Sequence, residues 1–412
     1  MFRLRKKDAA TAGLDIRKQT RRLYLFSFAS CLRLTDAVWV ALLVGRGYSL
    51  WQVGLAEGIF HLVSLAAEIP SGMAADLLGR RRTLALYGVL GMASALCMAG
   101  SRSFFGVCLS MLCKALACSF VSGTQEAILY DSLVAANETR EYLTVNARCT
   151  QLQSLAAALG NLASLLTDLL GFVGFYLAEA LVALTHTAAA LGLAEPLVTE
   201  QQARRQHAPF ADLPARFRAH VAASVRFLAG NPAVARLILA DAAAALPCYL
   251  LLMYLQQRLV ELGLPAIWLG IPIMLVRLSG LAGMELGRRL RPERLSRLFC
   301  GCTAVCAAGL LCAGLCPALP AAAGAVAANM SIEAWTLHAQ KALNEAYPSD
   351  QRATLVSVNS MAYSLLMIAA SPLSGWAGDL AGTAGASLCA LSIFAGLVCL
   401  AVLPRAARSA RR

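Results

Sequence analysis

The sequence predicts an all-α membrane protein with twelve transmembrane helices arranged as two six-helix pseudo-repeats. Of its 412 residues, 58% are hydrophobic and only 14% are charged, which is more apolar surface than a soluble domain can bury. Apolar runs of about 20 residues, the length that spans the hydrocarbon as a helix, recur along the chain. One charged, proline-containing stretch near the middle divides these runs six and six.

The individual spans follow from the apolar runs and the turns between them. The segments 83–101 and 381–403 contain no charged residue at all, and Pro317 and Pro320 divide the long uncharged stretch before 332 into two helices. Strands of a membrane β-barrel are excluded because these runs lack alternation of apolar and polar residues. No cleavable signal peptide is expected, because Arg33 and Asp36 interrupt the first apolar run. The expected spans are 23–45, 51–74, 83–101, 104–130, 144–167, 171–194, 234–258, 264–286, 296–316, 319–342, 353–377 and 381–403.

The positions of the basic residues predict the orientation. Most of the 36 lysines and arginines fall in segments on one side of this arrangement, whereas the loops of the other side hold only Arg46, Arg102 and Arg258. By the positive-inside rule, both termini are cytoplasmic in a multi-pass protein of the plasma or bacterial inner membrane. The net charge of +13 then matches an anionic inner leaflet. Nucleic acid is not an expected partner, because the basic residues are scattered over short loops.

Three parts of the chain are expected. Residues 1–195 form an N-terminal six-helix bundle and residues 234–412 a C-terminal one. Residues 196–233 form a cytoplasmic linker, in which apolar residues from Phe210 to Leu228 recur at helical spacing, as in a helix lying on the membrane surface. A soluble linker helix is the alternative. A shift of about half the chain length aligns Gly72 with Gly283, which supports an internal duplication.

The turn after the second span carries the sequence "GMAADLLGRRRTL". It resembles the loop motif of the Major Facilitator Superfamily, G-x-L-A-D-x-x-G-R-K/R-x-x-L, and it departs from that motif at Ala74. The segments "EIPSG", "SGTQEAILYDSL" and "PSDQRATLVSVNS" look like a bacterial, efflux-like branch of the superfamily. The resemblance covers essentially the whole chain and implies the twelve-helix fold of this family.

The physical chemistry of this turn is independent of the resemblance. Gly72 permits close helix packing, Gly79 allows the chain to reverse, and the arginines anchor the turn at the membrane surface. The Asp76 carboxylate is able to accept from helix amides of the other half or to pair with an arginine. The resemblance implies that Gly72, Asp76, Gly79, Arg80 and Asp131 form a cytoplasmic gating latch, which holds the outward-open state and in which Arg80 bridges to Asp131. The alternative is that the arginines serve topology only.

Ionisable residues inside membrane spans are costly and therefore mark candidate sites. In the second span Glu57, His61, Ser64 and Glu68 share one helix face, and a histidine one turn from a carboxylate is a candidate proton site. A structural hydrogen-bond network is the alternative. In the first span Arg33 and Asp36 form either an internal ion pair or a proton-cycling aspartate. The remaining ionisable residues within spans are Lys114, Asp241 and Arg277, which are candidates for coupling or substrate contact, and Glu179, His186, Glu333 and His338.

These features predict a secondary active transporter that moves a small molecule by alternating access, with proton-coupled export as the expected mode. The absence of a nucleotide-binding motif argues against ATP hydrolysis. Uptake or facilitated diffusion of a sugar or organic anion is the alternative within this class, and a non-transporting membrane sensor is the alternative outside it. No enzymatic activity and no cofactor are expected; the expected partners are the substrate, protons and lipid, with the protein a monomer.

Overall fold

A computed structural model describes residues 15–196, 222, 226–290, 292, 294–346 and 352–409, without the side chains of 69, 73–77, 352–356 and 402–409. Of the expected surface helix of the linker, only residues 222 and 226–228 lie within the described residues, and they are helical. Within them the secondary structure is helical and contains no strand. Each of the twelve expected spans overlaps at least one helix, and the predicted all-α class is confirmed.

The chain forms two compact units. The first unit contains Met1–Asp36, Ala66–Ala163 and Leu169–Arg218, and the second contains Ala37–Leu65, Ser164–Asp168 and Ala219–Arg412. Residues 37–65 therefore group with the C-terminal helices, although they belong to the N-terminal half of the sequence. The division into two six-helix bundles and a linker stays a prediction.

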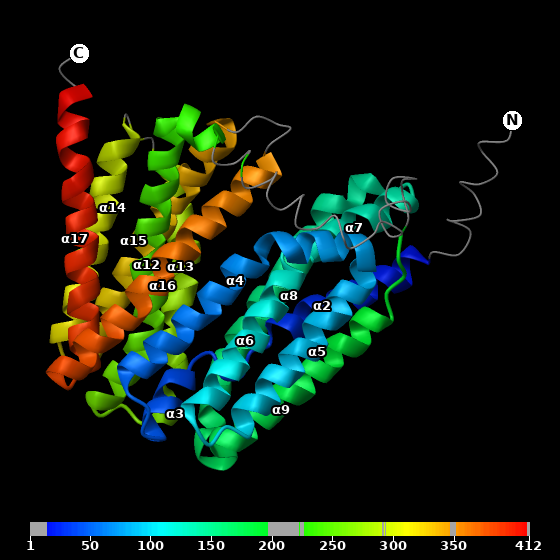
Figure 1. Ribbon diagram of the computed structural model, residues 1–412, viewed down its shortest axis with the longest axis horizontal. Helices are drawn as coiled ribbons and strands as arrows, with labels where there is room; N and C mark the ends of the chain where they lie inside the picture. The colour runs from blue at the N-terminus through cyan, green and yellow to red at the C-terminus, as the bar shows by residue number, and fades with distance from the viewer. Residues whose placement is uncertain are drawn as a thin grey trace, which may run out of the picture. The chain divides into compact units, whose positions relative to one another are not determined.

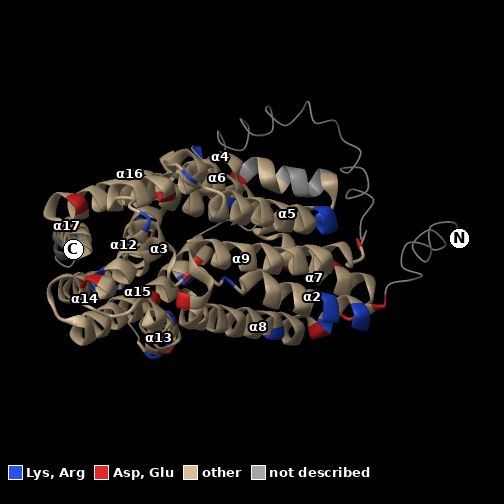
Figure 2. Ribbon diagram, turned by 90° about the horizontal axis from the view of Figure 1, so that it is seen from below, with Lys and Arg blue, Asp and Glu red and all other residues tan. Residues whose placement is uncertain are grey.

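In the first unit most of the long helices lie alongside one another (Figure 1). The helices of this unit are α2 (Ile16–Cys31), α5 (Arg80–Ala99), α6 (Phe104–Val121), α7 (Thr124–Ala135), α8 (Tyr142–Leu162) and most of α9 (Thr167–Leu191), with the 3-10 turns η1 (Thr139–Glu141) and η2 (Ala163–Leu166). Helix α5 packs against α6, and α2 packs against α7 and α8. Many of the Lys and Arg residues of α2, α5 and α8 gather toward one end of these helices, as Figure 2 shows, and a few charges lie near the middle.

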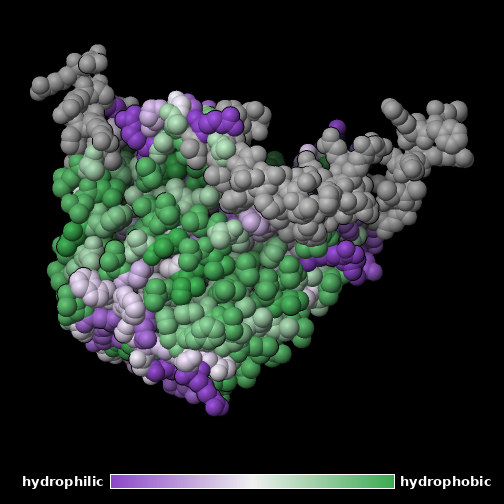
Figure 3. Space-filling view, viewed as in Figure 1, coloured by the Kyte–Doolittle hydropathy of each residue, from purple (hydrophilic) through white to green (hydrophobic). Residues whose placement is uncertain are grey.

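Helix α12 is the centre of the second unit. It contacts α3, α15, α16 and α17, while α14 packs against both α15 and α17 (Figure 1). The helices of this unit are α3 (Trp39–Gly45), α12 (Pro232–Glu261), α13 (Gly270–Arg289), α14 (Leu295–Leu315), α15 (Ala318–Ala346), α16 (Arg352–Ala381) and α17 (Ala384–Ser409), with η4 (Ala266–Trp268). On the visible face of α14 and α17, hydrophobic residues cover the middle and hydrophilic residues lie toward the ends (Figure 3).

Helix α4 (Leu50–Leu78) supplies residues to both units, and Pro70 lies inside it. Its first turns approach α16 very closely: a Cβ added at Gly58 would meet the Ile368 carbonyl oxygen at 3.3 Å, and one at Gly54 would collide with the Ser371 backbone. Small residues at such positions let two membrane helices pack backbone to backbone. This packing explains why residues 50–65 group with the C-terminal helices.

Eight helical stretches of the described residues are long and apolar enough to cross a membrane, judged by length and composition. One of them, Thr139–Leu191, is long enough to contain two of the expected spans. The expected first span, 23–45, is not continuous, because α2 ends at Cys31 and α3 begins at Trp39. This break contains Arg33 and Asp36, and a cluster of charged side chains surrounds it.

Candidate functional site

The turn between α4 and α5 is a single residue, Gly79. Its φ of +85° lies in the region that favours glycine, so the chain reverses there without a loop. Arg80 then begins α5, and its Nη1 forms an ion pair with Asp131 Oδ2 of α7 and a hydrogen bond to the Ala127 carbonyl. The structure therefore brings together Gly79, Arg80 and Asp131; their role as a gating latch stays a prediction.

The other two residues of the expected latch are placed differently. Gly72 is exposed within α4, and no described atom lies within 4 Å of a Cβ built there. The close helix packing expected at Gly72 is therefore not found among the described residues. Asp76 lies in the last turns of α4 rather than in a loop, and its side chain lies outside the described residues.

Glu195 completes this end of the first unit. Its two carboxylate oxygens accept from the backbone N–H groups of Arg80 at 2.8 Å and Arg81 at 2.7 Å. A carboxylate in this position satisfies helix N–H groups that lack an intrahelical partner and complements the positive end of the helix dipole. The sequence analysis missed Glu195; its signal was an acid directly after the sixth apolar run.

A second cluster of charges surrounds the break in the first span. The Glu179 carboxylate of α9 accepts from Leu34 N at 2.9 Å, from Thr35 N at 3.2 Å and from Thr35 Oγ1 at 3.4 Å. In hydrocarbon, N–H groups freed by a broken helix need a partner from the protein, because no water supplies one. Glu179 is that partner, a role that sequence spacing did not reveal.

The break also depends on Gly160 of α8. A Cβ at this position would lie 2.5 Å from the Arg33 carbonyl oxygen and 3.0 Å from the Arg33 carbonyl carbon. Only glycine therefore allows the backbone of Arg33 to lie this close to α8. The ionised side chains interact here: Arg33 interacts with Asp36, and Glu179 interacts with Asp36, Lys114 and Arg33. The structure thus joins Arg33, Asp36 and Lys114 in one charge cluster with Glu179.

The polar stripe of the second span divides between the two units. Glu57 and His61 belong to the second unit and are 3% and 5% exposed, whereas Glu68 belongs to the first. The Tyr249 hydroxyl of α12 donates to Glu57 Oε1 at 2.7 Å, and His61 Nε2 lies 3.4 Å from the same oxygen. A hydrogen-bonded acid and a histidine therefore share one buried position.

Aromatic rings enclose His61. Its ring centroid lies 5.2 Å from Phe60, 5.5 Å from Tyr363 and 6.0 Å from Tyr249, all in edge-on arrangements. The second ring nitrogen, Nδ1, lies 3.4 Å from the Ser364 hydroxyl. Tyr249, Tyr363 and Ser364 were not identified from the sequence, since their partners are far away along the chain.

The structure separates Asp241 from Arg277. Asp241 of α12 is 6% exposed, and its Oδ2 accepts from Asn359 Nδ2 of α16 at 3.3 Å. Arg277 is exposed on α13. Only Asp241 therefore sits in the buried position that the sequence suggested for both.

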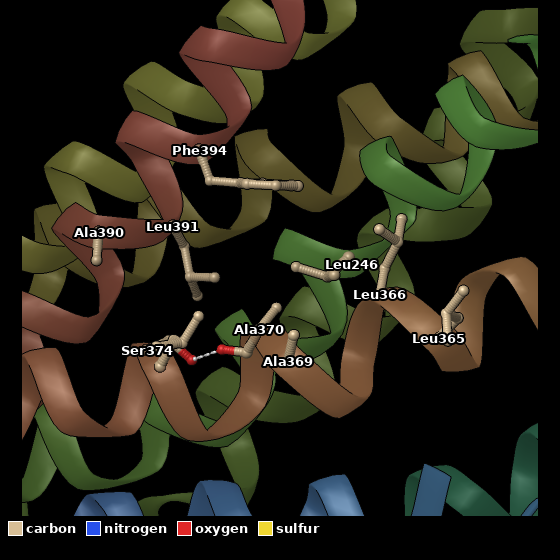
Figure 4. Close-up of a pocket in the computed structure, with 10 residues that line it drawn as sticks. Leu246, Leu365, Leu366, Ala369, Ala370, Ser374, Ala390, Leu391 and Phe394 are labelled. Atoms are coloured by element: carbon tan, nitrogen blue, oxygen red, sulfur yellow. Dashed lines mark hydrogen bonds between the residues drawn. The ribbon is translucent and has the colours of Figure 1, made fainter. Parts of the chain in front are cut away.

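An apolar cavity of about 300 Å³ lies between α12, α16 and α17 (Figure 4). Its one polar lining side chain, Ser374, donates to the Ala370 carbonyl at 2.7 Å and to Tyr254, so the cavity offers no free polar group. It fits an alkyl chain and not a charged ligand. Among the described residues no group of three or more His, Cys, Asp or Glu side chains is arranged to hold a metal ion. The residues that line the cavity are Leu246, Leu365, Leu366, Ala369, Ala370, Leu373, Ser374, Ala390, Leu391 and Phe394.

Apolar helices that enclose buried charge clusters define a polytopic membrane protein of the transporter type. The chain belongs to the Major Facilitator Superfamily, whose model matches residues 25–339. No functionally curated protein matches it in sequence.

Solved structures share its fold at low sequence identity. A mutant of the nucleoside transporter NupG is 13% identical with a TM-score of 0.75, covering 95% of this chain and 99% of that one. A POT family transporter in complex with a thioalcohol-conjugated peptide is 13% identical with a TM-score of 0.62, covering 95% and 96%. The human organic anion transporter MFSD10 is 20% identical with a TM-score of 0.60, covering 95% and 100%.

Proposed function

We propose that this protein is a secondary active transporter that exports a small organic molecule by alternating access, with protons as the coupling ion. The observation that carries this proposal is the buried Glu57–His61–Tyr249 cluster. A carboxylate and an imidazole 3.4 Å apart at such low exposure form a site at which one proton is shared and released without exposing a bare charge. Membership of the Major Facilitator Superfamily supports the transport function but not its direction or its coupling ion.

The substrate is a small organic solute. The similar structures are described as a nucleoside transporter, a POT family transporter in complex with a conjugated peptide and an organic anion transporter, which supports a substrate of this kind. Export and the efflux-like, bacterial character rest on the resemblance of the sequence motifs. Facilitated diffusion or uptake would use the same fold without proton-driven export.

The location we propose is the plasma or inner membrane, with both termini cytoplasmic. The basic residues gathered at one end of α2, α5 and α8 support this orientation (Figure 2). In this orientation the Arg80–Asp131 pair lies on the cytoplasmic side. Its proposed role, with Asp76, is to hold the outward-open state.

Proton coupling is tested in liposomes that contain the purified protein and a pH-sensitive dye. The probes are uridine, dialanine, 5-aminolevulinic acid and ethidium, and a probe that raises the melting temperature is taken into the flux assay. Proton movement on addition of that probe is the expected result. Binding without either proton movement or probe flux would favour the sensor and overturn the proposal.

Two substitutions locate the proposed functions. Glu57→Gln keeps an oxygen that accepts from Tyr249 but cannot ionise, so it is expected to flatten the pH dependence of flux. Asp76→Asn is expected to leave insertion intact and to reduce flux. Glu285→Gln is the matched control, because Glu285 is an exposed acid paired with Arg288. An unchanged pH profile in Glu57→Gln would show that the Glu57–His61–Tyr249 cluster has only a structural role. Normal flux in Asp76→Asn would refute the latch.

A further inference from the structure

A separate polar cluster lies in the second unit where α12, α15 and α16 meet. Asp241, Asn359 and Trp335 contribute one side chain each. Three of their atoms are buried without a hydrogen-bond partner: Asp241 Oδ1, Asn359 Oδ1 and Trp335 Nε1. Buried polar atoms in native proteins are normally paired, so the two unpaired oxygens require an explanation, whereas the Trp335 indole is close to the Asp241 carboxylate as a donor.

The two orphan oxygens belong to groups that already contact each other. Asn359 Nδ2 donates to Asp241 Oδ2 at 3.3 Å, which leaves one acceptor on each side chain unused. A carboxyl group and a carboxamide joined in this way need only one more hydrogen to form a cyclic pair with two hydrogen bonds. Reversing the amide would instead place two acceptors next to each other, so rotation does not solve the problem.

We propose that Asp241 and Asn359 form a proton-binding site, in which a proton on Asp241 Oδ1 donates to Asn359 Oδ1. The proton is taken up from water and no covalent bond other than O–H is formed or broken. The protonated pair satisfies both orphan oxygens at once. It also removes a carboxylate charge from a position that is 6% exposed and whose hydrogen bond from Asn359 is 3.3 Å long.

The groups around Asp241 favour a proton over a metal cation. The indole of Trp335 is close to Asp241 and turns an N–H rather than a lone pair toward the cluster. Its position is fixed by an edge-on contact with Phe299, with ring centroids 4.8 Å apart. A metal cation requires several oxygen ligands and no competing N–H donor.

The ionised carboxylate of Asp241 also has hydrogen-bond donors nearby. When Asp241 loses its proton, Trp335 Nε1 and Asn359 Nδ2 are the two donors available to its carboxylate. Among the described residues, the ionisable side chain that interacts with Asp241 from a neighbouring helix is Glu333 of α15. From the other helices around α12, Asn359 of α16 is neutral and Arg277 of α13 is exposed. Two acids facing each other disfavour double ionisation, which also supports one bound proton.

The role of this site in transport rests on the proposed proton coupling, but proton binding to Asp241 is measured without a transport assay. The experiment is infrared difference spectroscopy of the purified full-length protein between acidic and alkaline pH. The expected result is a carboxylic acid C=O band that Asp241→Asn abolishes and that both Glu333→Gln and the exposed-acid control Glu285→Gln retain. A band absent from the wild type, or retained in Asp241→Asn, would overturn the proposal, whatever the flux assay shows.

A second variant keeps the test independent of folding defects. Asp241→Asn supplies an amide N–H where the proton would be, so it is expected to melt like the acidic wild type and to lose the pH dependence of the melting temperature that Asp241 gives the wild type. The exchanged pair Asp241→Asn/Asn359→Asp restores one acid and one amide and is expected to recover the band. A folded exchange variant without the band would refute the pairing.

Discussion

Replacement of Glu179 by leucine tests whether this carboxylate stabilises the break in the first membrane span. The substitution removes the acceptor of the Leu34 and Thr35 N–H groups, which lie 2.9 and 3.2 Å from Glu179 Oε2. Each buried donor left unsatisfied costs about 1–3 kcal/mol, so the two together cost about 2–6 kcal/mol. The bilayer interior holds no water to replace the carboxylate, so this cost is not recovered by solvation.

The assay is amide hydrogen exchange of the purified protein, followed at the peptide that covers residues 32–38. A loss of about 2 kcal/mol corresponds to exchange that is roughly 30-fold faster. Glu179→Gln retains an oxygen that accepts from the same N–H groups, although neutral hydrogen bonds are weaker than charge-assisted ones. We therefore expect fast exchange in Glu179→Leu, intermediate exchange in Glu179→Gln and unchanged exchange in the exposed-acid control Glu126→Leu.

Two results would refute this reasoning. The first is unchanged protection of residues 34 and 35 in Glu179→Leu, which would show that the carboxylate does not hold the break. The second is equal exchange in Glu179→Gln and Glu179→Leu, which would show that charge with Arg33 and Lys114 matters and that the hydrogen bonds do not.

Three further changes test the packing and the helix ends. Gly160→Ala forces a Cβ to 2.5 Å from the Arg33 carbonyl oxygen and is expected to cost about 1–3 kcal/mol in thermal unfolding, whereas Gly91→Ala, with its nearest neighbour at 3.9 Å, is tolerated. Equal stability of these two variants would contradict the close packing. Asp379→Ala removes the carboxylate that caps the start of α4 at 2.8 Å and should cost about 1–2 kcal/mol, with faster exchange confined to the first turn. Glu195→Ala should cost a similar amount at the start of α5. Unchanged, slow amide exchange at the start of α5 in this variant would show that Glu195 does not cap the helix.

The helices were predictable because their signal is local. A run of about 20 apolar residues identifies a span wherever it occurs, and each expected span overlaps at least one helix. The break at 32–38 was missed because hydropathy averages over a window, and Trp39 to Gly45 are as apolar as a continuous helix would require. Arg33 and Asp36 indicated an unusual position in the span. The backbone N–H groups freed by the break were identified only in the structure, together with their acceptor Glu179.

The candidate sites were predictable only where their residues lie close together in the sequence. Glu57 and His61 were paired correctly as neighbours on one helix face, because four residues make about one turn. Tyr249 comes from a position 192 residues away and Asn359 lies 118 residues from Asp241, so no spacing rule connects them. Helix caps such as Glu195 share this limitation, since the acid and the helix that it caps are distant in sequence.

Three acids within the membrane spans fall into two kinds according to their partners: Glu179 is of one kind, and Glu57 and Asp241 are of the other, a difference that supports the proposed proton sites. The closest contacts of Glu179 Oε2 are two backbone N–H groups at 2.9 and 3.2 Å, which cannot accept a proton from the acid, and the Thr35 hydroxyl lies farther away at 3.4 Å, so protonation there competes with the hydrogen bonds that hold the chain. Glu57 and Asp241 instead face a hydroxyl and a carboxamide, each of which both donates and accepts. Those partners keep a hydrogen bond in either protonation state. A proton-coupled transporter needs acids of the second kind for coupling and acids of the first kind for structure. An amide substitution should therefore separate them: at Glu179 it weakens the fold locally, while at Asp241 it fixes the protonated form.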